Sequence, residues 1–165
     1  MTNTGQLQIT ARGEREIMWT RDFDAPRSLV FDALTKPELI KRWLGVRGGW
    51  SLAVCEVDLR VGGSYRYVWR GPKGEMGMGG VFREIVPPER IVTTEVFDDP
   101  WYPGGAVGTA VLVERGGKTT LTHTVLYDSR EARDGVLKSP MESGVVESYN
   151  TLETLLASTP AEGVA

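Results

Sequence analysis

Regularly spaced turn signals between residues 50 and 127 constrain the fold of this chain more than any other feature. Clusters of glycine and proline separate short segments rich in β-branched and aromatic residues, a pattern typical of hairpin connections. The signals are "GG" at 62–63, "GPKG" at 71–74, "PPER" at 87–90, "DDPWYPGG" at 98–105 and "RGG" at 115–117. Their spacing predicts an antiparallel meander of about six strands.

The glycine pairs invite comparison with phosphate-binding loops, but the segments that follow them do not fit. Gly62 and Gly63 lie between the β-like segments "SLAVCEVDL" and "SYRYVW", whereas a phosphate loop leads into a helix N-terminus. "GGKTT" at 116–120 resembles the end of a Walker A motif, but Leu112 occupies the position of its leading glycine. No helix follows "GEMGMGG" at 74–80 either. We therefore interpret these glycines as turn residues and expect no nucleotide site.

Short helices are predicted before the meander. Residues 16–23 form a β-like segment, and two short helices are expected after it, at 24–35 and 36–45. Asp24 is expected as the N-cap of the first helix, with Pro26 near its first turn.

A longer helix is predicted at the C-terminal end of the chain. Ser139 is expected as its N-cap, Pro140 occupies the first helical position and Glu142 completes a capping box. One or two further helical turns are expected just before it, in "SREARDGVL" at 129–137. Its apolar face consists of residues at helical spacing, namely Met141, Val145, Tyr149, Leu152 and Leu156.

Length and charge favour one soluble domain. The 165 residues suggest a domain at 15–157 between polar tails at 1–14 and 158–165. The net charge of −3 and the lack of a Lys/Arg block favour no nucleic-acid partner. No apolar stretch approaches the roughly 20 residues of a membrane helix, and the N-terminus lacks a signal-peptide pattern. We expect a cytoplasmic protein without a membrane partner.

Composition also restricts the chemistry. Cys55 is the single cysteine and His123 the single histidine, so an internal disulfide and a Cys/His zinc cage are excluded. No acidic cluster has the spacing of metal ligands, and we expect neither a metal nor another cofactor. Cys55 itself is interpreted as a small buried hydrophobic residue, because nothing in the sequence gives it an electropositive, accessible setting.

Three motifs together resemble a known family. They are "DLRVGGSYR" at 58–66, "GVFREIVPPERIV" at 80–92 and the helix beginning "SREARD" at 129–134. Over residues 15–157 the chain resembles the family named after activators of the heat-shock protein 90 ATPase, within the START-like, birch-pollen-allergen-like helix-grip superfamily. One departure is "RWLG" at 42–45, where many members carry a tryptophan pair followed by Gly-Pro.

The resemblance implies an α+β helix-grip fold. In that fold two short helices follow the first strand, and a seven-stranded antiparallel sheet curves around the long C-terminal helix, with a cavity between sheet and helix. Chaperone activation is not expected, since true activators carry an additional N-terminal domain for which this chain leaves no room. Single-domain members of bacterial type resemble small-molecule binders, and some are related by fold to polyketide cyclases.

Three functions therefore remain open. The first, which we favour, is binding of a small hydrophobic or aromatic ligand, which needs only an apolar pocket with a few orienting polar groups. The second is a cofactor-free enzyme such as a cyclase, dehydratase or hydrolase, which needs a base close to a substrate proton. The third is a chaperone-interacting module, which rests on the family name alone.

Strand alternation selects the residues that face the inside of the sheet. In "TTLTHTVLY", the alternate residues Leu121, His123, Val125 and Tyr127 are expected to face the helix or cavity, while the threonines face solvent. His123 is either a neutral core residue or a polar group of the site.

One cation is also predicted on the inner face. Arg21 shares a face with Trp19 and Phe23, and a charge on an apolar face needs a partner, for which Glu95 is the candidate. Combining strand parity, helix periodicity and the cavity implied by the resemblance predicts a ligand-binding site. Its residues are Arg21, Trp43, Trp69, Glu95, Phe97, His123, Val125, Tyr127, Met141, Val145 and Tyr149.

Two further predictions concern the surface. Arg66 and Glu84 are expected to form a cross-strand pair. Trp101 and Tyr102 lie in the loop "DDPWYPGG", where large apolar side chains lack an obvious packing reason. They are interpreted either as a cover for the cavity mouth or as part of a homodimer interface.

Overall fold

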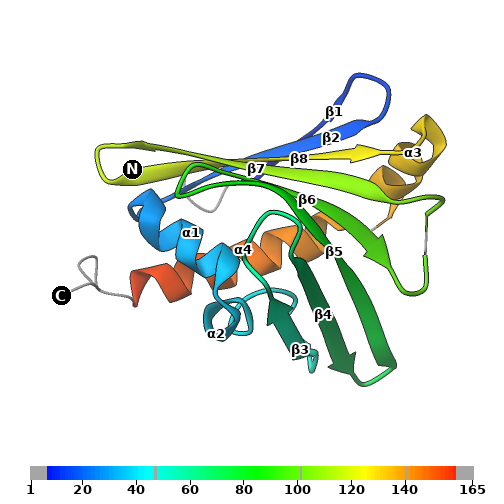
Figure 1. Cartoon of the computed structure of the whole chain (residues 1–165), viewed down its shortest axis with the longest axis horizontal. Helices are drawn as coiled ribbons and strands as arrows, with labels where there is room; N and C mark the ends of the chain where they lie inside the picture. The colour runs from blue at the N-terminus through cyan, green and yellow to red at the C-terminus, as the bar shows by residue number, and fades with distance from the viewer. Residues whose placement is uncertain (1–6, 47, 101, 140, 159–165) are drawn as a thin grey trace.

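The computed structural model describes residues 7–46, 48–100, 102–139 and 141–158. In these ranges the chain forms eight strands and four helices (Figure 1). In chain order the elements are β1 (Gln8–Arg12), β2 (Glu16–Phe23), α1 (Arg27–Thr35), α2 (Pro37–Ile40), β3 (Ser51–Val57), β4 (Ser64–Gly71), β5 (Gly74–Val86), β6 (Arg90–Phe97), β7 (Ala106–Arg115), β8 (Lys118–Tyr127), α3 (Arg130–Lys138) and α4 (Met141–Ala157).

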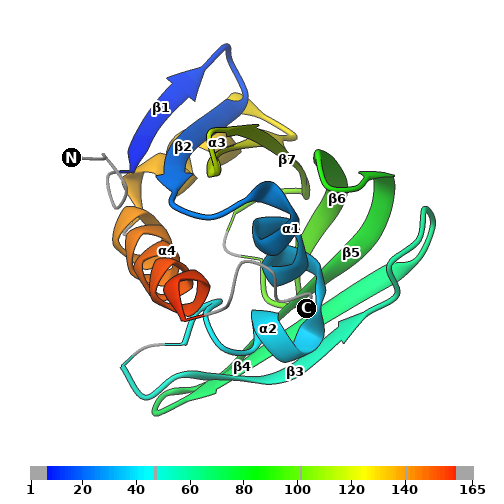
Figure 2. The ribbon, with the colours of Figure 1, turned by 90° about the vertical axis from the view of Figure 1, so that its left-hand side faces the viewer.

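The strands form one antiparallel sheet in the order β1-β2-β8-β7-β6-β5-β4-β3. The strands from β3 to β8 pair in sequence order, as expected for a meander, and β2 then pairs with β8, with Trp19 opposite His123. The sheet curves into an arc, and α1 and α4 lie on its concave side (Figure 2). The chain therefore has the α+β fold that was predicted, with an antiparallel sheet and a C-terminal helix.

The expected number of seven strands is wrong, because the sheet in the described part of the chain has eight. The additional strand is β1, which lies in the segment assigned to a polar tail and pairs with β2, placing Ile9 opposite Trp19. β1 is an edge strand, and all its residues except Ile9 are exposed. An exposed edge strand has no buried face, so it lacks the alternation by which a strand is recognised in sequence.

The glycine pair at 62–63 connects β3 to β4, as predicted, and Gly62 adopts a positive φ of 88°. A Cβ on Gly63 would collide with the carbonyl oxygen of Asp58, so that position also requires glycine. Arg60 Nε donates to Asp58 Oδ2 at 2.9 Å within the same loop. The sequence around the glycines therefore builds a tight strand connection and not a phosphate site.

The predicted N-cap of the first helix is wrong. The residue in the N-cap position of α1 is Pro26, which has extended backbone angles, and its carbonyl oxygen accepts from the amides of Leu29 and Val30. Asp24 lies two residues earlier, outside the helix. A proline with fixed φ can stand at this position without a side-chain cap, because its own carbonyl already begins the helix.

The helices near the C-terminus follow the prediction more closely. α3 is capped by Ser129, whose hydroxyl oxygen accepts from the amide of Ala132 at 3.0 Å. Ser139 ends α3 and its hydroxyl donates to the carbonyl oxygen of Val136. The predicted capping box of α4 is wrong, because the amide of Ser139 that should donate to the Glu142 side chain donates to the carbonyl oxygen of Val136. Pro140, predicted at the first helical position, lies outside the described residues. No helix in the described ranges is long and apolar enough to cross a membrane.

α4 is fastened to the sheet by a buried cation. Arg21 is only 2% exposed, and its guanidinium donates to Asn150 Oδ1 at 2.9 Å and to Glu153 Oε1 at 2.5 Å. The expected Arg21–Glu95 pair is therefore wrong. Arg21 is on β2 and Glu95 on β6, with β8 and β7 between them, whereas α4 packs directly over β2 within reach of the long arginine side chain.

The predicted Arg66–Glu84 pair is also wrong. Arg66 bonds both carboxylate oxygens of Asp98 at 2.7 and 2.5 Å, and Glu84 pairs instead with Arg90 at 2.9 Å. Arg66 stands opposite Gly79 of β5, and a Cβ on the nearby Gly77 would collide with Asp98. These glycines leave room for the Arg66 side chain to cross β5 and reach the end of β6.

Candidate functional site

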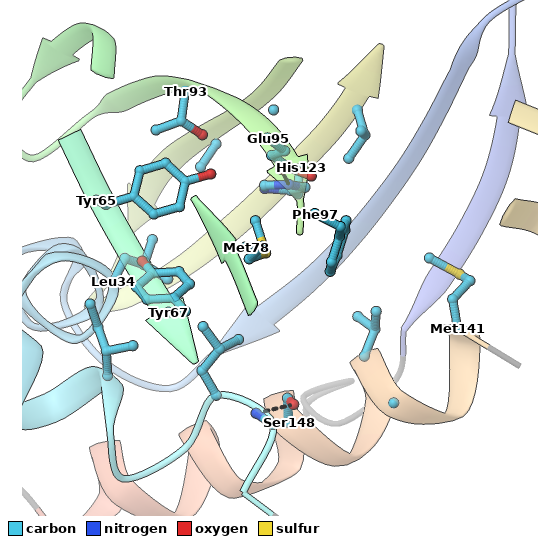
Figure 3. A pocket seen from close by; sticks show the side chains of 18 of the residues that line it. Leu34, Tyr65, Tyr67, Met78, Thr93, Glu95, Phe97, His123, Met141 and Ser148 are labelled. Carbon is cyan, nitrogen blue, oxygen red and sulfur yellow. Dashed lines mark hydrogen bonds and ion pairs between the residues drawn. The ribbon is translucent and has the colours of Figure 1, made fainter. Parts of the chain in front are cut away.

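A cavity of about 660 Å³ lies between the concave face of the sheet and the helices (Figure 3). Arg21 is the one predicted site residue that does not line it, because its side chain points to α4. The other ten all do, and they are Trp43, Trp69, Glu95, Phe97, His123, Val125, Tyr127, Met141, Val145 and Tyr149.

The inner face of β7, which borders the cavity, carries small residues. Ala106, Gly108 and Ala110 alternate along the inner face of β7, and Gly108 and Ala110 line the cavity. A Cβ added to Gly108 would lie 2.5 Å from Glu95 Oε2 and 3.3 Å from His123 Nε2. Glu95 from β6 and His123 from β8 therefore extend over the shallow groove above Gly108 of β7.

Glu95 on β6 and His123 on β8 form the polar centre of this groove. Their closest atoms, Oε2 of Glu95 and Nε2 of His123, are 4.0 Å apart, which is beyond hydrogen-bond distance. The two side chains keep 19% and 22% of their surface accessible, and both border the cavity. His123 also stacks on the Trp19 ring, with 4.7 Å between ring centroids.

Burial shifts the pKa values of Glu95 and His123 in opposite directions. Loss of solvation raises the pKa of Glu95 to about 7 and lowers the pKa of His123 to about 4. At neutral pH the imidazole is therefore neutral, and the carboxyl group is protonated in about half of the molecules. His123 matches the neutral core histidine considered from the sequence, and it is at the same time part of the cavity wall.

Tyrosines surround the carboxyl group. Burial, and to a smaller extent the charge of Glu95, raises the pKa of each of them, so all remain protonated hydrogen-bonding groups at neutral pH. Tyr65 donates to the carbonyl oxygen of Thr94 at 2.6 Å, and Tyr149 accepts from Trp19 Nε1 at 3.0 Å. The five are Tyr65, Tyr67, Tyr102, Tyr127 and Tyr149.

Several lining residues were missed from the sequence. Tyr65 and Tyr67 line the cavity from β4, and Met78 lines it from β5 (Figure 3). Alternation in "SYRYVW" places both tyrosines on the same face as Trp69, which was predicted, so the signal for them was present. Gly108 carried no such signal, because a glycine in a strand does not reveal that its missing side chain makes space.

For Tyr102 in the "DDPWYPGG" loop, the structure favours the first of the two interpretations, a cover for the cavity. Its side chain is buried and packs edge-on against Tyr127 at 5.2 Å and Phe97 at 6.1 Å between ring centroids. It lines the cavity, so it covers the cavity and is not an exposed interface residue. Trp101 lies outside the described residues. The homodimer stays a prediction.

Other reactive groups lie away from this centre. Cys55 on the edge strand β3 is half-buried, less than expected, and burial raises its pKa to about 11, with Lys41 opposing that shift. Its thiol is therefore protonated at neutral pH and a poor nucleophile. Within the described residues no three His, Cys, Asp or Glu side chains are grouped as ligands for a metal ion.

The family model described as Activator of Hsp90 ATPase homolog 1-like protein matches residues 24–157. The chain belongs to this family. Members of the family are known for ligand binding and are mostly not enzymes, and the cavity of this member fits that general property. No functionally curated protein matches the sequence significantly.

Solved structures of bacterial proteins share the fold. A protein from Rhodobacter sphaeroides is 34% identical and superposes with a TM-score of 0.86, covering 92% of this chain and 97% of that one. A protein from Nitrosomonas europaea is 28% identical with a TM-score of 0.73, covering 90% and 97%. A protein from Staphylococcus epidermidis is 29% identical with a TM-score of 0.78, covering 89% and 92%.

Proposed function

We propose that the protein binds a small, mainly apolar ligand in the cavity between α4 and the sheet. The observation that supports this is the cavity itself, whose volume of about 660 Å³ lies within the usual range for small-molecule sites. Its walls are chiefly aromatic and aliphatic, and its main ionisable groups, Glu95 and His123, converge on one place. Such a division is typical of sites that recognise one end of an apolar molecule.

The two kinds of wall have different roles in this proposal. The apolar side chains provide most of the affinity, because each square ångström of apolar surface removed from water contributes roughly 25 cal/mol. The tyrosine hydroxyls, Glu95 and His123 orient a polar group of the ligand. A misplaced polar group would leave buried donors or acceptors unsatisfied, which is the basis of selectivity.

Filling the cavity tests its location. Val145 of α4 lines the cavity and the neighbouring Val146 does not, so Val145→Trp and Val146→Trp form a matched pair. Binding of the neutral fluorescent dye Nile red, measured by titration, is expected to weaken at least about tenfold in Val145→Trp, because the indole ring occupies the space. Val146→Trp should bind as the wild type does.

Folding of both variants is checked by circular dichroism, and native mass spectrometry of freshly purified wild-type protein searches for a retained small molecule. Equal dye affinity in a folded Val145→Trp variant and in the wild type would place the binding site elsewhere. No dye binding to the wild type would contradict the proposal itself.

A cofactor-free enzyme is the second candidate. It is supported by the Glu95–His123 arrangement, in which a neutral imidazole and a carboxyl group that titrates near neutral pH lie 4.0 Å apart beside an apolar cavity. Such a pair can exchange protons with a bound molecule. Chemical conversion of a bound compound, followed by mass spectrometry and slowed about 100-fold or more in His123→Gln, would favour this candidate. Unchanged recovery of every bound compound would count against it.

A further inference from the structure

We infer that the preferred ligand is an organic cation, an amine or quaternary ammonium compound with an apolar body, whose charged end lies between Glu95 and the surrounding aromatic rings. This inference rests on the proposed binding function and names the chemical class that the cavity recognises.

The first argument is the charge of the cavity. Among the described residues that line it, Glu95 is the only carboxylic acid, and none is a lysine or arginine. The buried cation Arg21 is turned towards Glu153 on α4, and Arg66 is engaged by Asp98 outside the cavity. An anionic ligand would therefore face a like charge without a basic side chain in the wall, while a cationic ligand would find a counter-ion.

The second argument is that His123 does not neutralise Glu95. Its Nε2 is 4.0 Å from the carboxylate, and burial lowers its pKa to about 4. The Glu95 carboxylate therefore has no positively charged partner among the described residues that line the cavity. Burial raises the pKa of Glu95, and a cation placed beside the carboxylate would lower that pKa again.

The third argument is the aromatic wall around the carboxyl group. Tyr65 and Tyr67 pack at 5.0 Å between centroids on one side, and Tyr102 and Tyr127 pack at 5.2 Å on the other. The faces of such rings attract cations, and clusters of them recognise alkylammonium groups. An anionic group gains nothing from these faces, so the wall and the carboxylate favour the same class of ligand.

Three probes that share one apolar body test the inference. They are 4-phenylbutylamine, 4-phenylbutanol and 5-phenylpentanoate, titrated into the full chain at pH 8 by isothermal calorimetry. The amine is expected to bind at least about tenfold more tightly than the alcohol, and the carboxylate most weakly. In Glu95→Gln the amine and the alcohol should bind within about threefold of each other. Glu84→Gln, the same change at a residue outside the cavity, should keep the preference.

A second readout follows from the titration of Glu95. The groups that face it are His123 on β8 and the tyrosines of β4, β8, α4 and the loop after β6, and all of these are neutral at pH 7. The carboxyl group should therefore supply the proton that is lost when a cation binds. Calorimetry at pH 7 in buffers of different ionisation enthalpy should show release of roughly half a proton with the amine and none with the alcohol.

The outcomes separate this inference from the proposed function. If the alcohol or the carboxylate binds as tightly as the amine, the cationic class is wrong and the binding function stands. If Glu95→Gln keeps the full amine preference, the placement of the charged end beside Glu95 is wrong. If Nile red binds and none of the three probes does, the cationic class is wrong as well. If neither the dye nor any probe binds, both are overturned.

Discussion

Glu95 and His123 illustrate how one environment acts on two titratable groups. Both lose solvent at the same groove, so the charged form of each becomes less favourable in the folded state. For an acid this raises the pKa, here from 4.5 to about 7, and for a base it lowers the pKa, here from 6.5 to about 4. The two effects have opposite consequences for the dependence of stability on pH.

The first prediction concerns that dependence. The native state holds the Glu95 proton between pH 4.5 and about 7 while the unfolded state has lost it, so Glu95 makes stability fall as the pH rises. His123 makes stability rise between about pH 4 and 6.5, because only the unfolded state is protonated there. In the wild type these slopes of about 1.4 kcal/mol per pH unit oppose each other over most of the window.

Variants that remove one of the two groups should reveal the contribution of each group to the pH dependence of stability. Relative to the wild type, Glu95→Gln should become more stable by about 1.4 kcal/mol per unit as the pH rises through its window, whereas the relative stability of His123→Gln should decline. The free energy of unfolding, obtained from urea titrations at half-unit steps from pH 4 to 8, measures both. A constant difference from the wild type at all pH values would show that neither group titrates as described.

At the scale of single elements, the small residues of β7 leave room on the concave face of the sheet for the side chains of its neighbours. Its inner face carries Ala106, Gly108 and Ala110, between the larger side chains of β6 and β8. Any larger residue at Gly108 would meet the carboxylate of Glu95. The glycine of α3, Gly135, is in the opposite situation, because a Cβ there would meet no atom within 4 Å.

The second prediction uses these two glycines as a matched pair. Gly135→Ala should stabilise the protein by about 0.5 to 1 kcal/mol, since alanine favours helix and fits without contact. Gly108→Ala should destabilise it by about 1 kcal/mol, because the methyl group displaces the Glu95 carboxylate over the groove. Urea unfolding at pH 8 measures both changes. A stabilising effect of equal size at Gly108 would mean that the groove tolerates a side chain and is not kept open by the glycine.

At the scale of the whole molecule, the sequence predicted the order of the elements and the inward-facing residues better than the side-chain pairs that join distant elements. Turn signals and strand alternation place Phe97, His123 and Val125 on the concave side because those patterns are local. The partners of Arg21 and Arg66 were missed, because they depend on which elements pack together and on glycines that open a path across a strand. β1 was missed because an exposed edge strand carries no hydrophobic period.

The way α4 is attached leads to the last prediction. Hydrogen bonds from the rest of the fold reach later residues of α4: Ser148 accepts from the amide of Gly45, Tyr149 from Trp19, and Asn150 and Glu153 from Arg21. Its first two turns carry Met141 and Val145, which line the cavity and are only half-buried. Local stability follows such packing, so the helix should open more easily at its start.

In hydrogen–deuterium exchange of the free protein, amides in residues 145–148 should therefore exchange faster than those in residues 151–156. A ligand in the cavity packs against Val145 and should slow the first group much more than the second. The outer strand β1, which does not border the cavity, serves as the internal control and should not respond. Equal protection of both halves of α4 without ligand would show that the cavity does not loosen this wall. A ligand effect confined to the second half would place the ligand outside the cavity.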